Sequence, residues 1–145
     1  MQRIIGALIV SLAMISNLCD AQSGVKTPLP ADHPLVGTWK LNVPTTNCYE
    51  TYQVLADGTT HVTSGEEIAE SEFEISLHPD SKGFYKWVDK IIKDNGKPDC
   101  TKGITPIGDV SVTFIKLNPS GSQFLLCEME DIKACIGPFI RQEGI

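Results

Sequence analysis

The chain has 145 residues and a net charge of −6 at neutral pH. This length fits one domain with a single hydrophobic core. The acidic balance argues against nucleic acid and anionic membrane surfaces as partners, because both repel a negatively charged protein.

The N-terminal segment has the pattern of a secretory signal peptide. Arg3 supplies a positive charge, residues 4–18 are almost wholly apolar, and residues 19–21 offer a small-residue cleavage site. The apolar run is shorter than the ~20 residues that span a bilayer. We therefore expect residues 1–21 to be removed and the protein to be periplasmic or secreted, with no membrane insertion after cleavage. A short membrane anchor and a lipidated Cys19 are the alternatives.

The cysteines agree with export. Four of the five follow the cleavage site, and an even number in a small exported domain indicates two disulfides. Cys127 and Cys135 flank an expected hairpin turn, so we pair them, which leaves Cys48 to pair with Cys100. A thiolate metal site is the less favoured use of these cysteines, because the chain has no Cys-x-x-Cys pair.

Residues 22–34 are polar and contain three prolines, which prevent a helix and cannot fill a β-ladder. We expect an extended lead-in here, with His33 in contact with solvent. The folded domain is expected to cover residues 35–145.

The rest of the chain has the pattern of short β-strands separated by turns. Apolar and polar residues alternate in several runs, and Asp57-Gly58 between two such runs is a strong hairpin signal. The expected strands cover residues 36–42, 48–55, 60–63, 66–77, 83–93, 110–117, 122–128 and 133–142.

Three of these expected strands have unusual sequence features. Residues 66–77 carry five glutamates, which we interpret as one solvated face opposite Phe73 and Ile75. Residues 83–93 fit either a helical stripe or a strand, and we favour a strand because the other signals are β. Gly137-Pro138 predicts a bulge or an edge break in the last strand.

The chain is therefore expected to be all-β, with eight to nine short antiparallel strands and no strong helix. A meander of this length leaves exposed strand edges, and closure into an up-and-down barrel removes them.

The segment Gly37-Thr38-Trp39, early in a domain of antiparallel strands, resembles the Gly-x-Trp start of lipocalins and of bacterial lipocalin-like domains of the calycin superfamily. In that superfamily the tryptophan closes the base of the barrel, and an arginine near the end of the last strand packs across it. Arg141 stands at the matching position. The resemblance implies that Trp39 and Arg141 are a barrel-closing pair, held by ring and cation stacking.

Known catalytic patterns are not found in the sequence: there is no Gly-x-Ser-x-Gly elbow, no His-Glu-x-x-His and no phosphate-binding glycine loop. His33, His61 and His78 are scattered, so we expect no metal site, no cofactor and no enzymatic activity.

Aromatic residues on the expected strands either fill a core or line a ligand cavity. Our candidates for ligand contact are Tyr52, Tyr85, Trp87 and Phe114. The first functional hypothesis is non-catalytic binding of a small apolar or amphipathic ligand. The alternative is a protein-binding module that acts through loops, in particular residues 97–109 and the loop around Pro79. The protein partner is not identified by the sequence.

Overall fold

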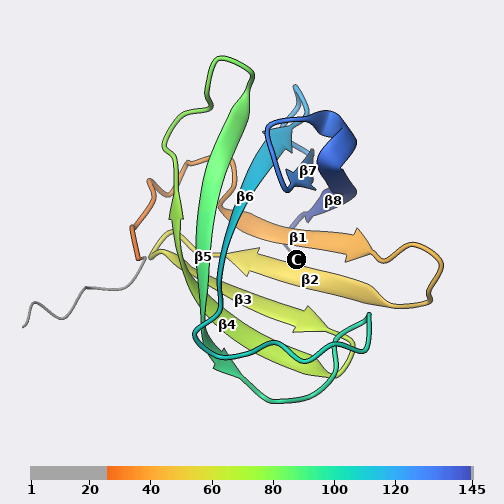
Figure 1. Ribbon diagram of the computed structural model, residues 1–145. Helices are drawn as coiled ribbons and strands as arrows, with labels where there is room; N and C mark the ends of the chain where they lie inside the picture. The colour runs from red at the N-terminus through yellow and green to blue at the C-terminus, as the bar shows by residue number, and fades with distance from the viewer. Residues whose placement is uncertain (1–25, 145) are drawn as a thin grey trace, which may run out of the picture.

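The computed structural model describes residues 26–144, which form a closed barrel of eight antiparallel strands in up-and-down order (Figure 1). The expected signal peptide and the start of the lead-in lie outside these residues. The elements are β1 (Gly37–Asn42), β2 (Tyr49–Val54), β3 (Thr59–Ser64), β4 (Glu67–Ile75), β5 (Phe84–Asp94), β6 (Val110–Leu117), β7 (Gln123–Cys127), a short 3-10 helix η1 (Ile132–Ala134) and β8 (Cys135–Gln142).

The all-β prediction is confirmed, and so is the prediction of a strand at residues 83–93. Each strand pairs with its neighbour in the chain, and β8 closes the barrel by pairing with β1. The predicted irregularity at Gly137-Pro138 is present, because the register between β7 and β8 shifts there. A second register shift lies between Glu70 and Ser71, where β4 pairs with β5.

The hydrophobic core fills one end of the barrel. Its members are inward-facing side chains of the strands, together with two leucines that precede β1, and most are large and fully buried. The core comprises Leu29, Leu35, Trp39, Leu41, Val54, Phe73, Ile75, Trp87, Ile115, Phe124 and Phe139.

The lead-in folds across this filled end instead of extending into solvent. Leu29 is buried and its backbone N–H donates to Ala56 O at 2.8 Å. His33 is only 6% exposed, so the expectation that it is solvated is wrong. Its ring packs edge-on against Tyr85 with centroids 5.4 Å apart, and burial lowers the pKa of the imidazole.

Trp39 and Arg141 meet where β1 pairs with β8. Their Cα positions are partners in the ladder, and the guanidinium carbon of Arg141 lies 4.1 Å from the centroid of the Trp39 ring. Arg141 also donates to three backbone carbonyls, at Val36 (2.9 Å), Gly121 (3.1 Å) and Pro34. One planar cation therefore joins the lead-in, the start of β1 and the β6–β7 turn.

Gly37 is required by this arrangement. Its φ of +141° lies in a region that L side chains rarely adopt. A Cβ atom added at this position would lie 2.5 Å from Nη1 of Arg141. The Gly-x-Trp pattern thus has a physical reason, since the glycine leaves the space that the guanidinium group occupies.

Both expected disulfides are present. Cys48 is bonded to Cys100 with Cα atoms 5.7 Å apart, and Cys127 is bonded to Cys135 across the last hairpin. The first bridge closes a loop with a sequence separation of 52 and fixes the long β5–β6 connection to the start of β2. In the chain-entropy account such a loop stabilises the fold by about 4 kcal/mol.

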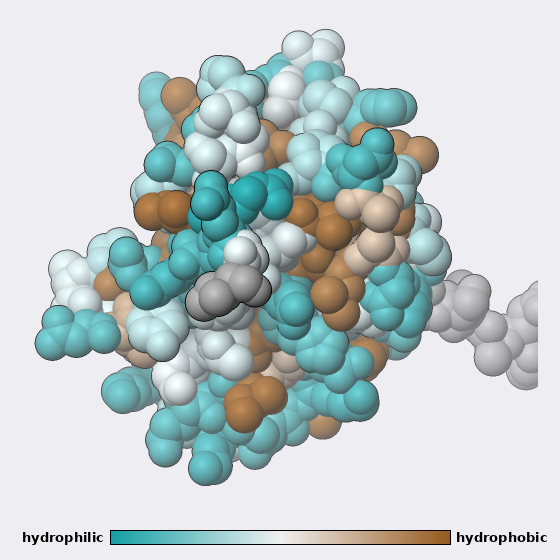
Figure 2. Space-filling model, turned by 180° about the vertical axis from the view of Figure 1, so that it is seen from behind, coloured by the Kyte–Doolittle hydropathy of each residue, from teal (hydrophilic) through white to brown (hydrophobic). Residues whose placement is uncertain are grey.

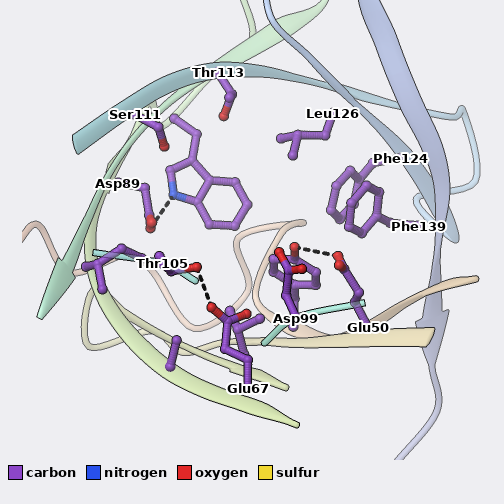
Figure 3. A pocket seen from close by; sticks show the side chains of 15 residues that line it. Glu50, Glu67, Asp89, Asp99, Thr105, Ser111, Thr113, Phe124, Leu126 and Phe139 are labelled. Atoms are coloured by element: carbon purple, nitrogen blue, oxygen red, sulfur yellow. Dashed lines mark hydrogen bonds between the residues drawn. The ribbon is translucent and has the colours of Figure 1, made fainter. Parts of the chain in front are cut away.

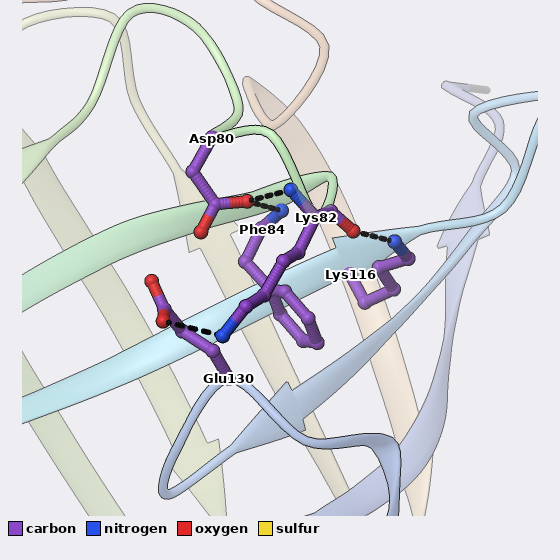
Figure 4. A network of polar contacts seen from close by, with 5 residues as sticks. All are labelled: Asp80, Lys82, Phe84, Lys116 and Glu130. Carbon is purple, nitrogen blue, oxygen red and sulfur yellow. Dashed lines mark hydrogen bonds and ion pairs between the residues drawn. The ribbon is translucent and has the colours of Figure 1, made fainter.

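Polar contacts hold the β4–β5 turn against neighbouring elements (Figure 4). The Asp80 carboxylate accepts from the backbone N–H groups of Lys82 (2.9 Å) and Phe84 (2.8 Å). Lys82 pairs with Glu130 at 3.4 Å, and Lys116 donates to the backbone carbonyl of Lys82. These contacts are exposed, so they orient the turn more than they stabilise the barrel.

The outer surface of the barrel is mainly hydrophilic in the view from behind, with hydrophobic side chains between the polar ones (Figure 2). The exposed large hydrophobic residues include Ile68 on β4 and Ile136 on β8. The part of the chain that the structure describes contains no helix with the length and apolar character needed to cross a membrane.

We predict that Arg141→Lys lowers the free energy of unfolding by roughly 2–3 kcal/mol, because lysine cannot make the forked backbone contacts or stack as a plane on the indole. Urea unfolding measures this, with Arg141→Met as the comparison that also removes the charge. Both variants should lose stability to a similar extent. A lysine variant as stable as the wild type would contradict the role given to the planar guanidinium group.

Candidate functional site

The end of the barrel opposite the Trp39–Arg141 pair contains a cavity of about 240 Å³ (Figure 3). Every strand except β1 contributes at least one side chain to its wall, and the β5–β6 loop contributes two. The lining residues are Glu50, Tyr52, Val62, Glu67, Ala69, Trp87, Asp89, Ile91, Asp99, Thr105, Ser111, Thr113, Phe124, Leu126 and Phe139.

The cavity borders an aromatic layer that continues into the filled end of the barrel. The rings of Phe124 and Phe139 are stacked, with centroids 4.5 Å apart and an interplanar angle of 7°. Tyr52 packs edge-on against Phe139 at 5.3 Å, and Trp39 packs edge-on against Phe124 at 4.7 Å. The closing tryptophan therefore supports two phenylalanines that line the cavity.

Four carboxylates also line the cavity, on β2, β4, β5 and the β5–β6 loop (Figure 3). Glu50 accepts hydrogen bonds from the hydroxyls of Tyr52 and Ser64, both at 2.8 Å. Asp89 accepts from the Ser71 hydroxyl at 2.7 Å and from the Trp87 indole N–H at 3.2 Å. Neutral donors thus fix the direction of both carboxylates without neutralising their charge.

The other two carboxylates are tied to the β5–β6 loop. Glu67 is 5% exposed and accepts a hydrogen bond from the hydroxyl of Thr105. Asp99 accepts from the backbone N–H groups of Thr101 (2.7 Å) and Gly103 (2.8 Å), which shapes the loop at the cavity. Since the Cys48–Cys100 bridge adjoins Asp99, the loop is covalently fixed at the rim.

Burial changes the acidity of these groups. Desolvation raises the pKa of Glu67, and the neighbouring carboxyl of Asp94 raises it further against the opposing effect of Thr105. Desolvation also raises the pKa of Asp89, partly offset by the hydrogen bonds from Ser71 and Trp87. The pKa of Tyr52 is raised well above its ordinary value by burial and by the negative charge of Glu50.

The cavity wall contains no lysine, arginine or histidine. The two ion pairs found within residues 26–144 are Lys82–Glu130 and Lys93–Glu70, and neither includes a carboxylate of the cavity. The cavity therefore combines aromatic and aliphatic side chains with four carboxylates, and its wall contains no compensating cation.

Two of the four residues predicted to contact a ligand lie in the cavity wall, namely Tyr52 and Trp87. Tyr85 points inward at the filled end, where it packs against His33 and the core. Phe114 is paired with Cys127, and its neighbours Thr113 and Ile115 are the inward-facing residues of β6. The structure does not bring Tyr85 and Phe114 together with the cavity.

The acidic lining was missed by sequence reasoning. The run of glutamates in β4 predicts a solvated face, but Glu67 is buried and faces the cavity. The alternation contains the signal: Glu67 is in phase with Ala69, Ser71 and Phe73, which all point inward. In the same way Asp89 is in phase with Trp87 and Ile91 on β5.

Among residues 26–144, no group of three or more His, Cys, Asp or Glu side chains is arranged to hold a metal ion. An aromatic wall joined to oriented carboxylates is suited to holding a small molecule with an apolar part and a polar part.

No protein-family model matches the chain, and no curated protein or solved structure shows a match to it. The function is therefore inferred from the residues of the cavity.

We predict that Asp89→Asn gains stability relative to the wild type as pH rises from about 4 to 8. The raised pKa means that the folded wild type loses stability when the buried carboxyl ionises. Asparagine keeps an oxygen for Ser71 and Trp87 and does not ionise.

The readout is the difference in free energy of unfolding between the two proteins at each pH. The free energy of unfolding of the wild type alone is a poorer measure. Hydrogen bonds lower the pKa of Asp57 and that of Asp80, so the protein also loses the stabilising contribution of these two carboxylates as pH falls. The difference should grow through the range in which Asp89 ionises and then level off. A difference that stays flat from pH 4 to 8 would contradict the burial of an ionised Asp89.

Proposed function

We propose that the protein is an exported, non-catalytic binding protein that holds a small apolar or amphipathic ligand inside a lipocalin-like barrel. The observation that carries this proposal is the cavity of about 240 Å³ at the end of the barrel opposite the closing pair. This space differs from a surface groove because its walls are side chains from seven strands of a closed barrel.

The size and lining of the cavity limit the ligand. Ligand pockets usually measure about 300–1,000 Å³, so this one suits a small molecule of one or two rings or a short chain. Phe124, Phe139 and Trp87 offer aromatic surface to an apolar body. The carboxylates and the hydroxyls of Ser111 and Thr113 offer acceptors and donors to a polar group.

Two further features support a lipocalin-like exported protein. The closed antiparallel barrel has Trp39 covered by Arg141 where the resemblance places this pair. Two disulfides staple the domain, which favours an oxidising compartment outside the cytoplasm.

A protein-binding role for the loops is the second candidate. The β5–β6 loop carries two strongly exposed isoleucines, Ile104 (57%) and Ile107 (64%), next to the cavity rim. Exposed apolar side chains on a loop fixed by a disulfide are suited to contact with another protein.

The first candidate is tested with three probes of one shape, 4-phenylbutan-1-ol, 4-phenylbutylamine and 4-phenylbutyrate. Each is titrated into the ¹⁵N-labelled protein while NMR follows the backbone amides and the Trp87 indole N–H. At least one probe should shift the signals of the cavity residues in a saturable way. If none of the three does so up to its solubility limit, the proposed function is wrong.

A matched pair of variants locates the binding. Thr113→Phe places a ring in the cavity, and it should weaken binding at least tenfold. Thr63→Phe adds the same ring on β3, where the side chain is exposed and does not line the cavity. The second variant should bind as the wild type does. Equal affinities for the two variants would place the binding outside the cavity.

A further inference from the structure

We propose that the ligand of this cavity is a small amphipathic cation, such as a primary amine or quaternary ammonium compound with an apolar body. This inference rests on the proposed binding function and adds the charge of the ligand. It is carried by the cavity, which combines an aromatic wall with carboxylates and contains no basic side chain.

The four carboxylates give the cavity wall a negative charge. Glu50, Glu67 and Asp99 line one side of the cavity, across from Thr113 and Leu126, and Asp89 lies on β5 next to Ser111 (Figure 3). A ligand with a carboxylate or phosphate would meet these groups at close range, and like charges at such distances repel. Fatty acids and other anions are therefore disfavoured, while a cation is attracted.

The cavity wall supplies no cation to balance this negative charge. A buried charge is costly unless it is paired, and proteins normally supply a partner. Glu67 is 5% exposed and faces the cavity. It accepts a hydrogen bond from the hydroxyl of Thr105, which is a neutral donor. The donors to Asp89 are neutral as well. A cationic ligand would supply the positive charge that the cavity wall does not provide to Glu67 and Asp89.

The Asp94 carboxyl adds negative charge next to Glu67. It raises the pKa of Glu67 through a hydrogen bond and through its charge. Asp94 does not line the cavity, and its Oδ1 atom accepts from the backbone N–H of Gly96 at 2.6 Å. A cation bound at Glu67 would offset the repulsion between these two carboxyls.

The aromatic wall defines the rest of the ligand. A cation attracts the face of an aromatic ring, and Trp87, Tyr52 and Phe139 all line the same space as the carboxylates. The apolar body then packs against Phe124 and Leu126. The combination of rings and unpaired carboxylates favours an organic cation over an inorganic one, because a metal ion has no use for the apolar wall.

The test ranks the affinities of the three probes of equal shape. At pH 7 and low salt, we expect 4-phenylbutylamine to bind at least tenfold more tightly than 4-phenylbutan-1-ol, and 4-phenylbutyrate to bind more weakly than the alcohol. Equal or weaker binding of the amine relative to the alcohol would overturn the inference and leave the binding function standing. If no probe binds in the cavity, the function itself fails.

Charge-neutral variants assign the preference to residues. Glu67→Gln and Asp89→Asn keep the size and the hydrogen-bond acceptors of the side chains, so each should reduce the amine's advantage over the alcohol at least threefold. Glu74→Gln removes a carboxylate from the same strand at an exposed position and should leave the ratio unchanged. An equal effect of all three variants would show only a general influence of net charge and would overturn the assignment.

The salt dependence of probe binding to the wild-type protein tests for an ionic contact without any variant. The affinity for the amine should fall several-fold between 20 and 500 mM NaCl, and the affinity for the alcohol should not. Parallel behaviour of the two probes would contradict an ionic contact in the cavity. This measurement tests the ionic contact even if the Glu67 or Asp89 variant fails to fold.

Discussion

The packing of Arg141 across Trp39 is the contact on which the rest of the structure depends. It joins the first and last strands at the seam of the barrel, and its hydrogen bonds also hold the lead-in and the β6–β7 turn. Gly37 provides the space for this contact. Because one end of the barrel is closed by a large ring, a cation and the buried lead-in, stability is concentrated there.

A filled end allows the opposite end to remain hollow. Trp39 supports Phe124, which stacks on Phe139, and both phenylalanines line the cavity. Beyond this aromatic layer the inward positions carry carboxylates and hydroxyls together with apolar side chains such as Val62, Ala69 and Ile91. Burial raises the pKa of Glu67 and Asp89, which means that the fold bears a cost to keep charge in this space. A binding site gives a reason for that cost, and a packed core does not.

The fold was largely predictable because its signals are local. Alternation locates the strands, and Asp57-Gly58 locates a hairpin. The expected turn between Cys127 and Cys135 pairs these two cysteines and leaves Cys48 for Cys100, and both bridges are present. Aromatic residues on strands point to Tyr52 and Trp87, which line the cavity, but sequence reasoning misses the carboxylates because charge usually indicates exposure. Glu67 is in phase with buried Phe73, yet only the closed barrel and the β5–β6 loop bury it. His33 was missed for the same reason, since its burial depends on how the lead-in crosses the barrel end.

If the carboxylates of the cavity bind a cationic ligand, the charge of that ligand will change their acidity. Carboxyl ¹³C NMR can measure the pKa of Glu67 and that of Asp89 in the free protein and again with saturating 4-phenylbutylamine. We expect both pKa values to lie above the ordinary range in the free protein and at least one to fall when the amine binds, because a nearby positive charge favours the ionised form. Ordinary pKa values in the free protein, or values that the bound amine leaves unchanged, would contradict this expectation.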